Sequence, residues 1–152
     1  MEACQSAKLF FSFLEEQYVF FTSSTDRYEL LLSNLNKAAA ERGPRERAIA
    51  PKRVSTTRWS SRADAAKCLR VGYSEIKATL EELAQECCTA RGLLKQMNTL
   101  ENGIYTAVWS DILERVNAVN VKLQNPKIDI NTSISLMKSL QTYNGSIRDS
   151  FN

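Results

Sequence analysis

Apolar side chains recur every three to four residues along nearly the whole chain, which is the spacing of amphipathic helices. The first such segment, residues 5–21, also carries six aromatic side chains, and these cover more than one helix face. A helix that is apolar most of the way round is normally buried on several sides. We therefore predict that this helix needs a covering partner. The side chains expected at that interface are Phe10, Phe13, Phe20 and Phe21.

A second helix is predicted over residues 26–40, directly after a polar run that offers several N-cap residues. Within it, Glu29 follows Asp26 at the spacing of a capping box, in which two side chains satisfy backbone N–H groups at the helix start. Residues 41–57 then break the pattern, because they contain Gly43, two prolines and many charged side chains. This stretch is predicted to be a basic loop or a mobile linker.

Helical spacing resumes after the loop and continues toward the C-terminus. One helix is predicted over residues 62–71, and after an interruption at Gly72 another continues to about Cys87. A fifth element begins near Thr89 and keeps its apolar spacing as far as the last proline. A break within it is predicted near Asn102–Gly103, because glycine costs about 1 kcal/mol in a helix interior.

The last helix is predicted to begin after Asn125–Pro126, where Asp129 or Asn131 can cap it. No stretch shows the alternation of apolar and polar residues that is typical of a strand. The predicted fold class is therefore all-α, an array of about six or seven helices with antiparallel packing. Its expected parts, within one structural unit, are a helical pair at residues 1–40, the basic loop at 41–57 and a helical domain at 58–152.

The net charge of +3 is unevenly distributed. Residues 41–70 carry nine Lys and Arg side chains against three acidic ones, so this stretch has a net charge of +6. Basic side chains neutralise phosphates, and an exposed tryptophan can stack on a base. The alternative is a solvated loop whose charge only promotes solubility. The hypothesis of DNA contact names Lys52, Arg53, Arg58, Trp59 and Arg62.

Composition excludes several classes of chemistry. The chain has no histidine, which rules out Ser/His/Asp and Cys/His catalysis. Its four cysteines lack C-x-x-C spacing, so we expect reduced thiols, no metal site and no cofactor. No segment reaches the roughly 18 apolar residues that a membrane span requires, and the first residues lack a signal-peptide pattern. We therefore expect an intracellular protein that does not enter a membrane.

One stretch is more specific than composition. Residues 57–65, with the sequence T-R-W-S-S-R-A-D-A, resemble the T-R-W-S-C-R-x-D-A block of hAT-type transposases. The closer resemblance is to their domesticated and zinc-finger MYM-type-like relatives. Ser61 stands where these relatives often have cysteine, which is a small chemical change. Further blocks that resemble the family, in the same order, occur at residues 18–25, 72–76, 90–94 and 108–115.

This resemblance implies the helical insertion region of an RNase H-like catalytic domain. The three metal-binding carboxylates of that family lie outside the matching blocks and have no counterpart in this chain. We therefore expect a non-catalytic fragment that is not an enzyme and that acts in the nucleus. In the family, the T-R-W tryptophan lies near the active site and stabilises a displaced base. The resemblance carries this role over to Trp59, with Arg58 beside it and Arg62 placed to reach a phosphate.

Two functions compete at this point. The first is a transposase-derived fragment that contributes structure and contacts DNA near the T-R-W motif. The second is a scaffold for protein interaction or oligomerisation, which would bind a partner or a second copy through the aromatic N-terminal helix. A reading frame without selected activity is a third alternative. Salt-sensitive DNA binding would favour the first function, and concentration-dependent association without DNA binding would favour the second.

Overall fold

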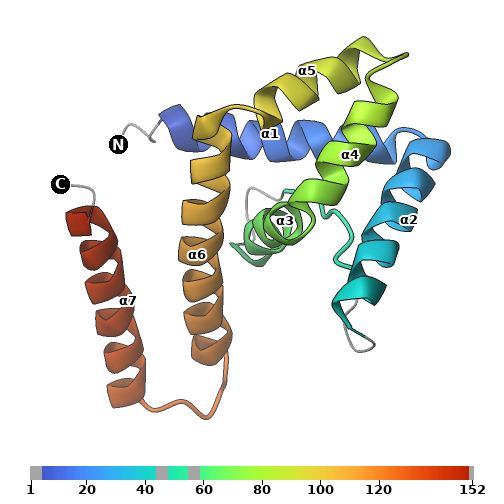
Figure 1. The fold of residues 1–152 in the computed structure, drawn as a ribbon. Coiled ribbons are helices and arrows are strands. Elements are labelled where there is room, and N and C mark those ends of the chain that lie inside the picture. The colour runs from blue at the N-terminus through green and yellow to red at the C-terminus, as the bar shows by residue number, and fades with distance from the viewer. Residues whose placement is uncertain (1–4, 44–47, 55–58, 151–152) are drawn as a thin grey trace.

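The chain folds as an array of helices (Figure 1). The computed structural model describes residues 5–43, 48–54 and 59–150. Within these ranges there are seven α-helices and no strand, which confirms the predicted fold class. The helices are α1 (Gln5–Thr22), α2 (Thr25–Arg42), α3 (Trp59–Val71), α4 (Tyr73–Leu83), α5 (Cys88–Met97), α6 (Leu100–Leu123) and α7 (Ile130–Ser150).

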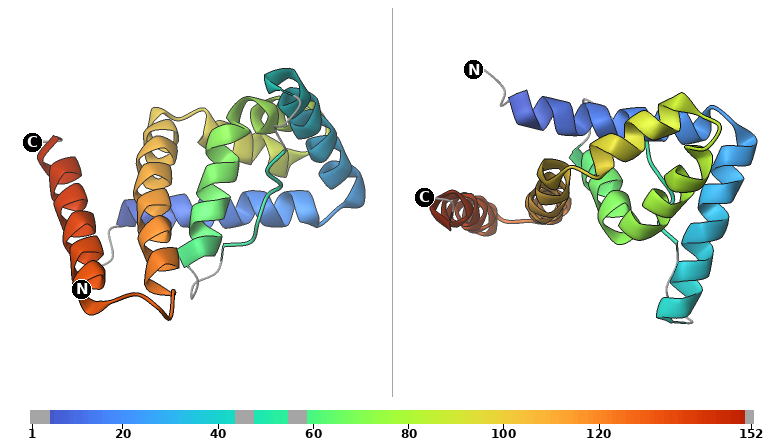
Figure 2. Two further views of the ribbon diagram at one scale, coloured as in Figure 1. Left: turned by 90° about the horizontal axis from the view of Figure 1, so that it is seen from below. Right: turned by 45° about the horizontal axis from the view of Figure 1, so that its top comes forward.

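Helix α1 is the centre of the packing. It runs across the body and contacts α2, α3 and α5. Helices α4 and α5 pack on each other, and α4 also packs on α2. Helix α6 lies along α3 in the most extensive helix pair, and α7 packs principally against α6. Figure 2 shows α6 between α7 and the rest of the body, so α7 forms an outer layer.

The aromatic side chains of α1 lie inside the protein. Phe10, Phe13, Phe20 and Phe21 are all 5% exposed or less and belong to one core cluster with residues of α2 to α6. The prediction that they form a partner interface is therefore wrong. The physical reason is that α1 is covered on several sides by other helices of the same chain, which supply the burial that its apolar faces require. The exposed apolar side chains of α1 are instead Leu9 and Val19.

The break in the long apolar segment lies at Asn98–Thr99, four residues before the predicted position. Thr99 is the N-cap of α6, and its side chain accepts a hydrogen bond from the backbone N–H of Asn102 at 3.3 Å. This cap stabilises a helix start upstream of Gly103. The glycine then lies in the first turn of α6 and no longer interrupts a helix interior.

Of the caps predicted for the last helix and for α2, the first is confirmed and the second is wrong. Asp129 caps α7 as predicted, because its carboxylate accepts hydrogen bonds from the backbone N–H of Thr132 at 2.8 Å and from its hydroxyl at 2.6 Å. At α2 the N-cap is Ser24, without a side-chain bond, so the capping box predicted at Asp26 is wrong. Asp26 lies in the first turn instead, where its negative charge suits the helix dipole.

Gly72 marks the predicted interruption between α3 and α4. A Cβ atom at this position would lie 2.6 Å from Cδ2 of Leu35 and 3.2 Å from the backbone oxygen of Cys68. Leu35 is buried in the core, so it has little room to move aside. Glycine therefore allows the α3–α4 junction to approach α2 closely. In the described part of the chain, no helix is both long and apolar enough to cross a lipid bilayer.

Candidate functional site

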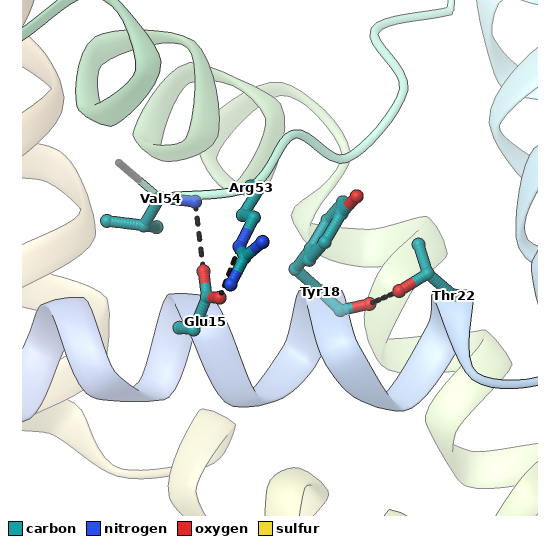
Figure 3. A network of polar contacts seen from close by, with 5 residues as sticks. All are labelled: Glu15, Tyr18, Thr22, Arg53 and Val54. Carbon is teal, nitrogen blue, oxygen red and sulfur yellow. Dashed lines mark hydrogen bonds and ion pairs between the residues drawn. The ribbon is translucent and has the colours of Figure 1, made fainter. Parts of the chain in front are cut away.

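Residues 41 and 42 of the predicted basic loop belong to the last turn of α2, and residues 48–54 are fastened to α1 and α3. The Glu15 carboxylate accepts hydrogen bonds from the Val54 backbone N–H at 3.0 Å and from the Arg53 guanidinium at 3.2 Å (Figure 3). The ammonium group of Lys52 lies 2.7 Å from the Asp64 carboxylate. These contacts place residues 52–54 against α1 and α3.

The basic side chains of α3 also have partners on neighbouring helices. Lys67 lies 3.7 Å from Glu114, and Arg70 forms an ion pair with Asp111. Both acidic partners are on α6, so much of the positive charge predicted for residues 41–70 is balanced by acids from distant parts of the sequence. The guanidinium of Arg62 lies over the ring of Phe11, 4.9 Å from its centroid, in a cation–π contact.

The structure thus places the five residues of the DNA-contact hypothesis in different settings. Lys52 and Arg53 are ion-paired but largely exposed, at 58% and 76% of their side-chain surface. Arg62 is half-buried on α3. Arg58 lies outside the described residues, and Trp59 begins α3 with its side chain outside the described part. Among the three described side chains of this set, Lys52 and Arg53 pair with acids on different helices and Arg62 lies over Phe11, so these three contact different partners.

A groove lies between α1 and α5. Its volume is about 760 Å³, and its walls include Val19 and Phe20 from α1 and Gly92 and Leu93 from α5. Val19 is 52% exposed, whereas Phe20 and Leu93 are buried at its floor. An added Cβ at Gly92 would meet no heavy atom within 4 Å, so the α5 side of the groove is open.

The two ends of this α1–α5 groove carry opposite charges. At one end, Glu16 is exposed, and its carboxylate lies 3.5 Å from the side-chain amide of Gln96. At the other end, Arg27 lies over the Phe20 ring, 4.6 Å from its centroid, and donates hydrogen bonds at 3.4 Å to the Phe20 carbonyl and the Ser23 hydroxyl. The groove is therefore apolar in the middle and polarised along its length.

Helix α7 carries a second unpartnered apolar feature. Ile130, Ile134 and Met137 are 78%, 47% and 53% exposed, and their spacing places them on one helix face. No described side chain of α7 is buried. The contact with α6 includes the guanidinium of Arg115, 5.6 Å from the Tyr143 ring centroid. We call the three exposed residues the outer stripe of α7.

The described cysteines are not part of a site. Burial raises the pKa of the Cys68 thiol to about 12, and this thiol donates a hydrogen bond to the Ile49 carbonyl at 3.1 Å. The Ala90 backbone N–H lowers the pKa of the Cys87 thiol. Cys68, Cys87 and Cys88 are all free thiols, as predicted, and Cys4 lies outside the described residues. Elsewhere in the described ranges, no three Cys, Asp or Glu side chains gather as metal ligands would.

Comparison with known proteins adds no relative. No family model matches the chain, and neither a curated protein nor a solved structure matches it. The resemblance of five sequence blocks to hAT-type transposases stays a prediction. The α1–α5 groove was not predicted from the sequence. Two of its residues give a weak signal: Val19 is apolar but lies outside the core, and Gly92 has no side chain although nothing packs closely against it.

Proposed function

We propose that the chain is a non-catalytic helical scaffold for protein interaction, with the α1–α5 groove as its docking site. The observation that carries the proposal is the exposure of Val19 at 52% above the buried floor of Phe20 and Leu93. An apolar groove flanked by polar side chains is typical of an interaction site. The resemblance to the non-catalytic region of hAT-type transposases supports the absence of catalysis and an origin as a transposon-derived protein of the nucleus.

The shape and charge of the α1–α5 groove favour a helix as its occupant. Two helices form the walls, and an amphipathic helix recognises such a groove by laying its apolar face along the floor. Glu16 and Arg27 then select the direction of the bound helix, because each end of the groove attracts the opposite charge. A partner helix with a basic residue at one end of its apolar stripe and an acidic residue at the other fits best.

Selection from a library of amphipathic helical peptides tests this function. We expect peptides enriched on the wild-type protein to bind it with micromolar or better affinity, and to lose at least about tenfold in affinity for Gly92→Arg, which fills the α1–α5 groove without a backbone clash. Gly103→Arg is the matched control, because it is also a helical glycine with no atom within 4 Å of an added Cβ. Peptides that bind both variants equally well, or a selection without enrichment, would contradict the proposal.

Contact with DNA is a second candidate function, favoured by one observation. Arg53 and Val54 are held on α1 by Glu15, and Trp59 of the T-R-W motif begins α3 shortly after them in the chain. Lys52 and Arg53 remain largely exposed, so each can exchange its carboxylate partner for a phosphate. Lys67 and Arg70 of α3, however, pair with acids of α6, which reduces the positive charge available for DNA. The interaction scaffold is therefore the better supported of the two functions.

Trp59→Ala tests the DNA-contact function. If this function is correct, the variant weakens binding to a single-stranded or hairpin DNA end by about 1–3 kcal/mol, which is the usual contribution of one stacking aromatic. The free energy of unfolding changes by less than about 1 kcal/mol, as for a surface substitution. Fluorescence anisotropy with a labelled DNA end and urea denaturation measure the two quantities. Unchanged DNA binding, or a loss of several kcal/mol in stability, would show that Trp59 only packs.

A further inference from the structure

We propose that the occupant of the α1–α5 groove is helix α7 of a second copy of this chain. This inference rests on the proposed docking function and names its partner. Helix α7 is the one helix without a buried described side chain, and Figure 1 shows it at the edge of the molecule. Its outer stripe of Ile130, Ile134 and Met137 faces solvent in the single chain. The chain therefore carries both an apolar groove and an uncovered apolar helix face.

The lengths of the two surfaces agree. From Ile130 to Met137 the outer stripe rises about 10 Å, at 1.5 Å per residue. On α1, the distance along the helix axis from Glu16 to the helix end at Thr22 is about 9 Å by the same rise. Val19 lies in the middle of this span, above the buried Phe20. Two turns of α7 can therefore lie along the floor of the groove.

The charges at the ends of the two surfaces are complementary. Asp129 precedes the outer stripe of α7, and Lys138 follows it. The α1–α5 groove has Arg27 at one end and Glu16 at the other. With α7 antiparallel to α1, Lys138 of one copy lies beside Glu16 of the other, and Asp129 beside Arg27. The reverse direction would oppose like charges at both ends, so the charges select one orientation.

The contact is between two chains because α7 cannot reach the groove of its own chain. Helix α7 packs on α6, and Figure 2 shows α6 between α7 and the helices that form the groove. The groove and the outer stripe are different patches, and a two-fold contact brings both pairs of patches together at once. Two copies close the assembly when each places its α7 in the groove of the other.

Charge reversal across this contact is the closing experiment. Sedimentation equilibrium of the full chain measures association of the wild type, Glu16→Lys, Lys138→Glu and the double variant. We expect each single reversal to weaken association by about 3- to 10-fold, and the double reversal to restore it to within about twofold, because the ion pair is re-formed with opposite sense. Glu82→Lys on α4 and Lys37→Glu on α2 are exposed controls that should leave association unchanged.

A second variant tests the apolar part of the same contact. Met137→Asp places a charge in the outer stripe, and we expect it to reduce association by at least about tenfold. The urea midpoint of unfolding, measured at a concentration where both chains are monomeric, stays unchanged because Met137 is 53% exposed. A chain that stays monomeric at every concentration overturns the inference, as does association that ignores the charge reversals. The peptide selection can still enrich binders in either case. The two experiments therefore distinguish a wrong partner from a wrong docking function.

Discussion

Phe10→Ala is expected to lower the free energy of unfolding by about 3–5 kcal/mol, the usual cost of removing a buried aromatic ring. The Phe10 side chain is fully buried, and its ring meets Phe11 edge-on with centroids 5.5 Å apart. It also meets the ring of Tyr105 on α6 at 6.4 Å. The substitution therefore leaves a cavity between α1 and α6 that the surrounding helices cannot fully close. Urea denaturation followed by circular dichroism measures the change.

Leu9→Ala is the matched control for this prediction. Leu9 is the neighbouring residue on α1 and is 64% exposed, so its truncation should change stability by no more than about 0.5 kcal/mol. A Phe10→Ala variant as stable as Leu9→Ala would mean that the aromatic face of α1 is a surface after all. In that case the partner interface predicted from the sequence would have to be reconsidered.

Leu113→Ala is expected to cost about 2–5 kcal/mol, as for other fully buried leucines. Leu113 is 1% exposed and is the buried residue of α6 within the core cluster, with half-buried Tyr105 and Trp109 beside it. It belongs to the helix that forms the most extensive pair of the fold, α3 with α6. Its removal therefore weakens the attachment of α6 to the body, which thermal and urea denaturation both report.

Val121→Ala separates this effect from a change in helix propensity. Val121 is on the same helix but is 59% exposed, and alanine is the better helix former, so stability should stay the same or rise slightly. Equal losses for Leu113→Ala and Val121→Ala would contradict the packing described for α6. A loss of stability that is confined to Leu113→Ala supports the packing of α6 against the other helices.

The helical fold was predictable from the sequence because local spacing determines most of it. The interruption at Gly72 and the cap at Asp129 follow from residue types that act within one turn. The start of α6 was misplaced because the cap at Thr99 competes with the glycine signal at Gly103, and the sequence does not show which is stronger. Burial of Phe10 was not predictable, since it depends on how distant helices close around α1.

The ion pairs near the candidate sites were likewise not predictable from the sequence. The basic stretch at residues 41–70 is plain in the sequence, but its acidic partners Glu15, Asp111 and Glu114 are far from it along the chain. Only the tertiary fold brings these acids together with the basic side chains. The α1–α5 groove likewise forms where two helices pack together, so no local sequence motif indicates it.

Mapping where a selected helical peptide binds tests the proposed function most directly. Amide chemical shifts of the ¹⁵N-labelled chain are followed while the peptide is added. The proposed function predicts that the largest changes occur along residues 15–22 of α1 and 89–96 of α5, the two walls of the groove, and that Gly92→Arg abolishes them. Changes that cluster on residues 48–54 and α3 instead, or that persist in Gly92→Arg, would contradict it.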